Sequence, residues 1–163
     1  MITQNELKEQ LFYDAITGEF TRLISNSSRS KVGYIAGCFD KHNGYIKIGI
    51  NGKYYKAHRL AWLYMTGSLP IGMLDHVDMN KINNAWINIR QATSSENSLN
   101  VGLKTTNKSG YKGVSFSKAS GKWYAHAKLN GKSKHLGSFI LPQDAAKAYE
   151  RFAMNNHGEF FRI

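Results

Sequence analysis

Short runs of β-branched and aromatic residues, each ended by a glycine-containing turn, constrain the fold more than any other feature of the sequence. Ile46, Ile48 and Ile50 alternate with smaller or charged residues, as in a half-buried strand. The dipeptide Asn51-Gly52 follows directly and is a strong signal for a two-residue hairpin turn. Such runs predict strands at 33–39, 44–50 and 53–59, a hairpin over 11–23 turning near Thr17-Gly18, and three further strands after residue 110.

Helical signals separate and follow these strand-rich stretches. Apolar spacing predicts a helix over 58–66 that ends at Gly67. Thr93 and Glu96 have the spacing of a capping box, which predicts that a helix starts at Thr93. A second helix is predicted over about 142–156, with Pro142 at its first position. The sequence therefore predicts an α+β protein with four parts: a strand-rich scaffold at 1–57, a central unit at 58–100, a linker at 101–109 and a sheet with one helix at 110–163.

The charge of the chain is strongly basic and unevenly distributed. The 163 residues include 22 Lys and Arg against 11 Asp and Glu. No acidic residue occurs between Glu96 and Asp144, where eight lysines lie: Lys104, Lys108, Lys112, Lys118, Lys122, Lys128, Lys132 and Lys134. Because such one-sided charge attracts a polyanion and releases its counterions, we expect a nucleic-acid partner. The alternative is a solvated face that serves solubility alone, although a surface with interspersed positive and negative charges serves solubility better.

Several classes of protein are excluded by composition. The single cysteine, Cys38, allows neither a disulfide framework nor a zinc site with several thiolates. No apolar run is long enough to span a membrane, and the first ten residues do not resemble a signal peptide. We expect a soluble, cytoplasmic protein that does not contact a membrane.

The segment 73–100 carries the residues to which chemistry can be assigned. Its elements are Asp75-His76, Asn83-Asn84, Asn88-Ile89-Arg90 and Glu96-Asn97, preceded by His58-Arg59-Leu60-Ala61-Trp62 and Gly67-Ser68-Leu69-Pro70. Over roughly residues 55–100 this arrangement resembles the HNH endonuclease family, in its phage and intron-encoded branch. The resemblance implies a ββα-metal unit, in which two short strands and a helix bind one divalent ion.

These residue types suit phosphodiester hydrolysis. The reaction needs a base to activate water and a cation to stabilise the departing oxygen, and a histidine can be neutral near pH 7. The resemblance implies that His76 is the general base, that Asp75 and Asn97 hold the metal ion, and that Asn88 fixes the loop that orients His76. Two protein oxygens with water and phosphate oxygens favour Mg²⁺, or Mn²⁺, over zinc.

Neighbouring residues of this segment have simpler interpretations. Arg59, a further candidate at the scissile phosphate, could equally hold backbone or pair with an acid, and His58 is ambiguous in the same way. Asp78 and Asn80 are better explained by the turn after the first strand than by metal binding. Met79 stands where the family often has glycine, which leaves the conformation of this loop open.

Residues 109–161 resemble the plant ethylene-response-factor (APETALA-type) DNA-binding domain. The resemblance rests on Tyr111-Lys112-Gly113-Val114, Lys122-Trp123-Tyr124-Ala125, Leu136-Gly137-Ser138-Phe139, Asp144-Ala145-Ala146 and Ala148-Tyr149. It implies a three-stranded antiparallel sheet that enters the major groove, backed by one helix.

Candidate DNA contacts in and before this segment are mostly lysines. They are Lys104, Lys108, Lys112, Ser115, Ser117, Lys118, Lys122, Trp123, His126, Lys128 and Lys134, with Trp123 equally well explained as core. Lysine is a point charge without the bidentate geometry of arginine, so we expect binding with modest base discrimination.

Together the two modules predict a homing-type DNA endonuclease of phage origin, active in the cytoplasm of a bacterial host. The C-terminal sheet would hold double-stranded DNA while the central unit hydrolyses one strand. We expect a monomer that nicks, since one ββα-metal unit attacks one strand. Two alternatives stay open: a DNA-binding regulator with a degenerate nuclease site, and RNA binding through Tyr111, Trp123 and Tyr124.

Overall fold

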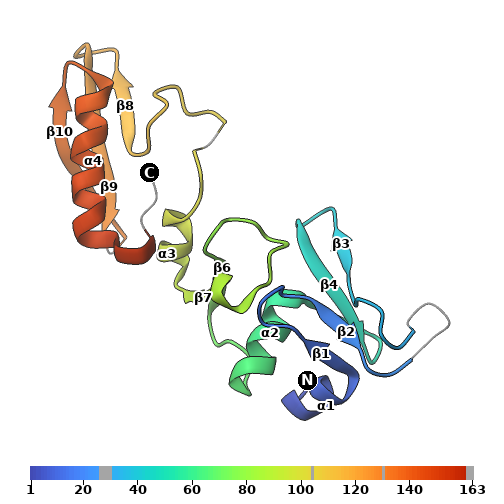
Figure 1. Cartoon of the computed structure of the whole chain (residues 1–163). Coiled ribbons are helices and arrows are strands. Elements are labelled where there is room, and N and C mark those ends of the chain that lie inside the picture. Colours follow the sequence, from blue (N-terminus) through green and yellow to red (C-terminus); the bar gives the residue numbers. More distant parts are fainter. Residues whose placement is uncertain (26–30, 104, 130, 161–163) are drawn as a thin grey trace. The chain divides into compact units, whose positions relative to one another are not determined.

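A computed structural model of the chain describes all residues except 26–30, 104, 130 and 161–163. The chain divides into two compact units, Met1–Thr93 and Ser94–Ile163, whose elements are labelled in Figure 1. Each unit has hydrophobic clusters of its own. Among the described residues, no helix combines the length and the apolar character needed to cross a membrane.

The N-terminal unit is built from three small antiparallel sheets and two helices. Its sheets are β1–β2, β3–β4–β5 and β6–β7. In chain order the elements are α1 (Gln4–Gln10), β1 (Leu11–Tyr13), β2 (Phe20–Arg22), β3 (Cys38–Asp40), β4 (Tyr45–Ile50), β5 (Lys53–Lys56), α2 (Ala57–Thr66), β6 (Met73–His76), η1 (Trp86–Asn88) and β7 (Ile89–Ala92).

Most predicted elements of this unit are present, with shifted boundaries. The hairpin of β1 and β2 turns at Gly18, and α2 ends at Gly67 in the left-handed conformation. The strand predicted at 33–39 is reduced to β3, since Gly37 has a φ of +121°, and the strand predicted at 53–59 stops at Lys56, where α2 begins.

Helix α1 was not among the expected elements. Thr3 and Glu6 form a capping box, in which the Glu6 backbone N–H donates to Thr3 Oγ1 and the Thr3 backbone N–H donates to Glu6 Oε2. Leu7 on this helix is fully buried. The capping-box spacing was therefore visible in the sequence, but the short helix shows no long apolar period beside it.

One hydrophobic core joins the first 57 residues to the β6–β7 hairpin. It contains Leu7 and Leu11 from the N-terminus, Ile48 from β4, Leu60 from α2 and Leu74 from β6. The strand-rich scaffold and the predicted catalytic hairpin thus belong to one packed body, and the scaffold supports the hairpin directly.

The C-terminal unit has the architecture predicted for it. Strands β8 (Val114–Ser117), β9 (Lys122–Leu129) and β10 (Lys132–Phe139) form an antiparallel sheet in the order β10–β9–β8. Helix α4 (Pro142–His157) packs on one face of the sheet, where Ala125, Ala145 and Ala153 are fully buried because alanines allow close approach. Helix α3 (Ser94–Leu99) precedes the sheet, and η2 (Gly158–Phe160) follows α4. The α+β fold class is confirmed.

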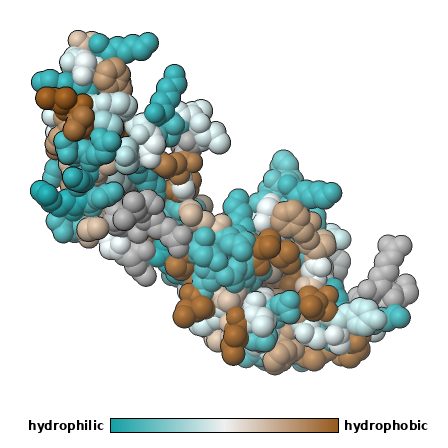
Figure 2. Space-filling view, turned by 45° about the horizontal axis from the view of Figure 1, so that its top comes forward, coloured by the Kyte–Doolittle hydropathy of each residue, from teal (hydrophilic) through white to brown (hydrophobic). Residues whose placement is uncertain are grey.

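The surface of this unit reflects its lysines. In Figure 2 much of its visible surface, at the upper left, is hydrophilic.

Candidate active site

The β6–β7 hairpin places Asp75 and His76 side by side at the end of β6. The register pairs Asp75 with Arg90 and His76 with Ile89. Arg90 donates from Nε and Nη2 to Asp75 Oδ2 at 3.1 and 2.9 Å, and the Asp75 side chain is only 7% exposed. The arginine thereby fixes the orientation of a carboxylate that would otherwise be costly to bury.

The His76 imidazole is buried, at 4% exposure, and lies beside two aromatic rings and a side-chain amide. Its ring centroid is 5.0 Å from that of His58, on α2, and 5.9 Å from that of Tyr45, on β4. Its Nε2 atom is 3.5 Å from Asn84 Oδ1. Burial lowers the pKa of His76, against the opposing effects of Asn84, Asp78 and Asp75, which favours the neutral imidazole at neutral pH.

The pKa of His58 is lowered more than that of His76. Burial, with smaller contributions from His76 and Lys56, lowers the pKa of His58 to about 3. Its Nδ1 atom is buried with no hydrogen-bond partner among the described residues. At neutral pH, His58 is therefore an uncharged aromatic ring that packs against His76.

Asn88 holds the loop between β6 and β7 by three hydrogen bonds. Its amide nitrogen donates to Asp78 Oδ1 at 2.9 Å and to the Asn83 carbonyl at 2.8 Å, while its amide oxygen accepts from the Asp78 backbone N–H. Asn83 and the Asn80 backbone N–H also donate to the Asp78 carboxylate. Burial alone would raise the pKa of Asp78, but these hydrogen bonds lower it. Asp78 and Asn80 thus shape the turn.

Met79 occupies the position where the family often has glycine, and its φ of +65° explains that preference. The Met79 backbone N–H donates to the His76 carbonyl, which closes a tight turn directly after the histidine. A left-handed conformation costs a side-chain-bearing residue about 1 kcal/mol. The turn after His76 therefore holds a residue with a side chain in the left-handed region.

The β1–β2 hairpin supports the same loop from behind, a role that the sequence did not reveal. Tyr13 Oη donates to the Asn84 carbonyl at 2.7 Å, and the Trp86 backbone N–H donates to the Ala15 carbonyl. A Cβ atom added to Gly18 would lie 2.2 Å from the Ala85 backbone nitrogen. These contacts join residues about 70 positions apart, so no local pattern could have predicted them.

The remaining candidates of the catalytic set lie further from His76 in the chain. Arg59 Nη2 donates to the Pro70 carbonyl at 3.2 Å, so it holds the segment that leads into β6. Asn97 is half-buried on α3, which groups with the C-terminal unit. Their roles at a scissile phosphate and a metal ion stay predictions.

The donor atoms at the end of β6 suit a hard divalent cation. The described residues contain no group of three or more His, Cys, Asp or Glu placed to hold a metal ion. Cys38, on β3, is exposed. Asp75 supplies one buried carboxylate at the end of β6, and carboxylate oxygens are ligands that a hard divalent cation accepts.

Comparison with known proteins assigns the segment that contains this hairpin. Residues 55–99 match a family described as HNH endonuclease. Protein 3.8 of Escherichia phage T7 is 36% identical over 115 residues, which cover 68% of this chain and 94% of that protein. The chain belongs to the HNH endonuclease family.

A second viral relative supports this membership. A protein of Acanthamoeba polyphaga mimivirus, described as an uncharacterized HNH endonuclease, is 31% identical over 105 residues. The alignment covers 63% of this HNH family member and 54% of the mimivirus protein, so the chain spans about half the length of that relative. No solved structure matches the chain.

In the C-terminal unit of this HNH family member, the candidate DNA contacts do not share one face of the sheet. Because Ala125 and Ala127 are buried against α4, the residues between them point to the opposite face, called the outer face below. The outer face carries Ser115, Ser117, Lys122, Tyr124, His126, Lys128, Ser133 and His135. Tyr124, Ser133 and His135 were not among the sequence candidates for DNA contact, although strict alternation along each strand predicts them.

Two sequence candidates lie on the face covered by α4. Trp123 packs in the cluster of Val114 and Ala125, 5.0 Å from the ring of Phe116, so the core interpretation of this tryptophan is confirmed. Lys134 Nζ lies 5.2 Å above the ring of Phe152 on α4. The number of lysines alone could not show which of them lie on the outer face of the sheet and which lie on the face covered by α4.

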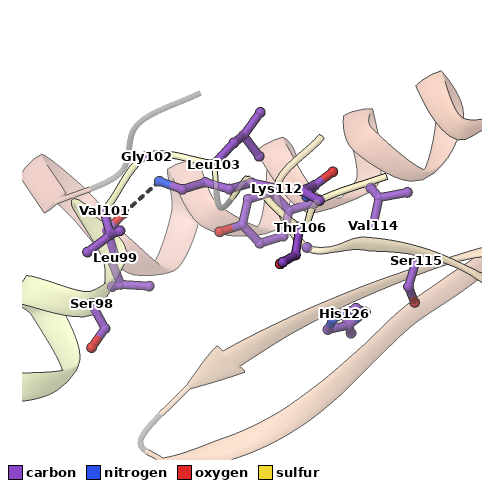
Figure 3. Close-up of a pocket in the computed structure, with 13 residues that line it drawn as sticks. Ser98, Leu99, Val101, Gly102, Leu103, Thr106, Lys112, Val114, Ser115 and His126 are labelled. Carbon is purple, nitrogen blue, oxygen red and sulfur yellow. Dashed lines mark hydrogen bonds between the residues drawn. The ribbon is translucent and has the colours of Figure 1, made fainter. Parts of the chain in front are cut away.

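The other lysine candidates lie in turns and connections. Lys112 donates to the Leu99 carbonyl at 2.8 Å, which ties the start of the sheet to the end of α3 (Figure 3). It lines a cavity of about 420 Å³, together with Ser115 and His126 on its sheet side. Lys108 and Lys118 are exposed, and Lys104 lies outside the described residues.

Proposed function

We propose that the chain is a DNA endonuclease of the homing type that hydrolyses phosphodiester bonds with His76 as general base. The observation that supports this most is a neutral, buried histidine beside a fixed carboxylate, within the segment that matches the family. The viral relatives agree with a phage origin.

In this proposal each residue of the site has a separate role. His76 accepts the proton of the attacking water, while Asn84 and His58 orient its ring. Asn88 holds the loop that fixes this orientation, and Arg59 fixes the segment before β6. Asp75 and Asn97 would hold a Mg²⁺ or Mn²⁺ ion, which when bound supplies positive charge for the departing oxygen.

The C-terminal unit would hold the duplex through the outer face of its sheet. A three-stranded sheet backed by one helix supports the ethylene-response-factor-like role, because alternate side chains of one face can enter the major groove together. We infer nicking by a monomer, since one catalytic hairpin serves one strand.

Plasmid relaxation tests the catalytic assignment. With Mg²⁺ or Mn²⁺ the parent chain should convert supercoiled plasmid to the nicked form, and EDTA should stop the reaction. His76→Ala should abolish nicking without weakening DNA binding in a gel-shift assay. His42→Ala, which removes an exposed histidine from the β3–β4 turn, should nick like the parent.

Two results would contradict the proposal. Equal nicking by the parent and His76→Ala would remove His76 from the mechanism. Tight DNA binding by the parent without cleavage under either metal would favour the second candidate, a DNA-binding regulator with a degenerate site.

A further inference from the structure

The sheet β3–β4–β5 presents a charged and aromatic face that the catalytic site has not used. The side chains of Ile46, Ile48 and Ile50 point into the core, so Tyr45, Lys47 and Gly49 point to the opposite face of the sheet. The register places Tyr54 opposite Gly49 and Lys56 opposite Lys47 on that same face. Tyr45, Lys47, Tyr54 and Lys56, with the neighbouring Lys81, are called the lysine–tyrosine strip below.

The lysines of the strip lie over its tyrosine rings. Lys56 Nζ lies 4.1 Å and Lys81 Nζ 4.9 Å from the centroid of Tyr45, and Lys47 Nζ lies 5.3 Å from that of Tyr54. Lys81 also donates to the Asn43 carbonyl. These contacts restrict the ammonium groups, so less side-chain entropy is lost when they bind an anion.

The strip leads to the proposed general base. The Tyr45 ring is 4.9 Å from that of His58 and 5.9 Å from that of His76. A ligand that follows the lysines towards Tyr45 therefore reaches the catalytic imidazole without leaving this face of the N-terminal unit.

Charge and exposure indicate what the strip binds. Residues 31–57 contain five lysines and one acid, Asp40, which pairs with Lys47 at 3.8 Å. Tyr54 is 72% exposed and lies beside Gly49, its partner in the strand register. Ammonium groups suit phosphate, and an exposed tyrosine ring can stack on a base or a sugar.

We propose that the lysine–tyrosine strip binds the phosphate backbone of the substrate DNA beside the scissile bond and directs it to His76. This proposal rests on the proposed nuclease function. It gives the N-terminal sheet a role in substrate binding, separate from the outer face of the C-terminal sheet.

The test compares two lysines of the same strand on opposite faces of the sheet. Lys56→Gln removes a charge from the strip, whereas Lys53→Gln removes the same charge from the other face of β5. Lys56 is the N-cap residue of α2 but makes no side-chain hydrogen bond to the helix, so its replacement removes no capping bond. Lys56→Arg keeps the charge.

Duplex DNA binding by the full chain is measured at several salt concentrations, in EDTA and in the His76→Ala background. Lys56→Gln should weaken binding about tenfold and reduce the salt slope by about 0.9, the value for one phosphate contact. Lys53→Gln and Lys56→Arg should bind like the reference chain. In the active chain, Lys56→Gln should raise KM for plasmid and leave kcat unchanged.

Equal binding by Lys56→Gln and Lys53→Gln would overturn the proposal, even if the parent chain nicks DNA. A parent chain that never nicks would refute the proposed function, while the binding comparison would still decide the role of the strip. Single-stranded RNA that displaces duplex DNA from the reference chain but not from Lys56→Gln would assign the strip to RNA and overturn the inference.

Discussion

At the scale of single residues, the Asn88 side chain holds the loop between β6 and β7 in place. It donates to the Asp78 carboxylate and to the Asn83 carbonyl, and both distances are below 3 Å. We expect Asn88→Ala to lower the free energy of unfolding by about 2 kcal/mol, since buried hydrogen bonds are lost. Asn88→Asp should cost more at pH 8, because a second carboxylate would face Asp78, and should improve relative to Asn88→Ala as the pH falls and the new acid is protonated. Urea denaturation at pH 8 and pH 5.5 measures this; a nearly isosteric Asp tolerated better than Ala at pH 8 would contradict it.

His58 makes a pH-dependent contribution to stability at the same scale. Its pKa in the folded state is about 3, against about 6.5 for an unperturbed histidine. Between these values the unfolded chain binds more protons, so the free energy of unfolding falls as the pH falls, by about 2 kcal/mol between pH 7 and pH 5. His58→Phe should remove most of this loss in urea denaturation, whereas His42→Ala, at an exposed histidine, should keep it. The same pH dependence in the parent and His58→Phe would show that the imidazole is not buried as described.

At the scale of elements, the β1–β2 hairpin positions the loop that carries Asn84. Gly18 and Gly52 both have a φ near +75°, but a Cβ atom meets backbone at 2.2 Å at Gly18 and nothing within 4 Å at Gly52. Alanine at either position meets left-handed strain of about 1 kcal/mol or less. Gly18→Ala should cost about 2 kcal/mol more than Gly52→Ala, since the two backbones must separate, and it should also reduce nicking. Thermal denaturation and plasmid relaxation of the two variants provide the comparison, and equal costs would mean that the hairpin does not support the loop.

The same scale shows which features of the sequence were sufficient for prediction. Turn dipeptides and apolar periodicity predicted the hairpins, α2 and α4, because these depend on neighbouring residues. The resemblance carried by Asp75, His76 and Asn88 implied two short strands here, and β6 and β7 form them. The support from Tyr13 and Gly18 could not be predicted, since those contacts close only when distant segments pack. The face of each lysine required the strand register, which counting charges does not give.

At the scale of the whole molecule, the two units differ in how many acidic residues balance their positive charge. Residues 94–163 carry eleven basic and four acidic side chains, and residues 1–93 carry eleven and seven. We therefore expect the C-terminal unit to supply most of the non-specific DNA affinity, with little base discrimination because its strands carry lysine and no arginine.

Two pairs of lysines in the C-terminal sheet allow a test of whether DNA binds to one face of the sheet or is attracted by the total charge. Lys122 and Lys128 lie on the outer face, whereas Lys132 and Lys134 lie on the face covered by α4. Replacing either pair by glutamine removes two positive charges from the same sheet. The outer pair should reduce the salt slope of duplex binding by about 1.8, or 0.9 for each phosphate contact, and the helix-side pair should reduce it much less. Fluorescence anisotropy over a salt series measures both slopes. If the two pairs reduce them equally, the C-terminal unit attracts DNA by its total charge alone, and its sheet does not dock in the groove through one face.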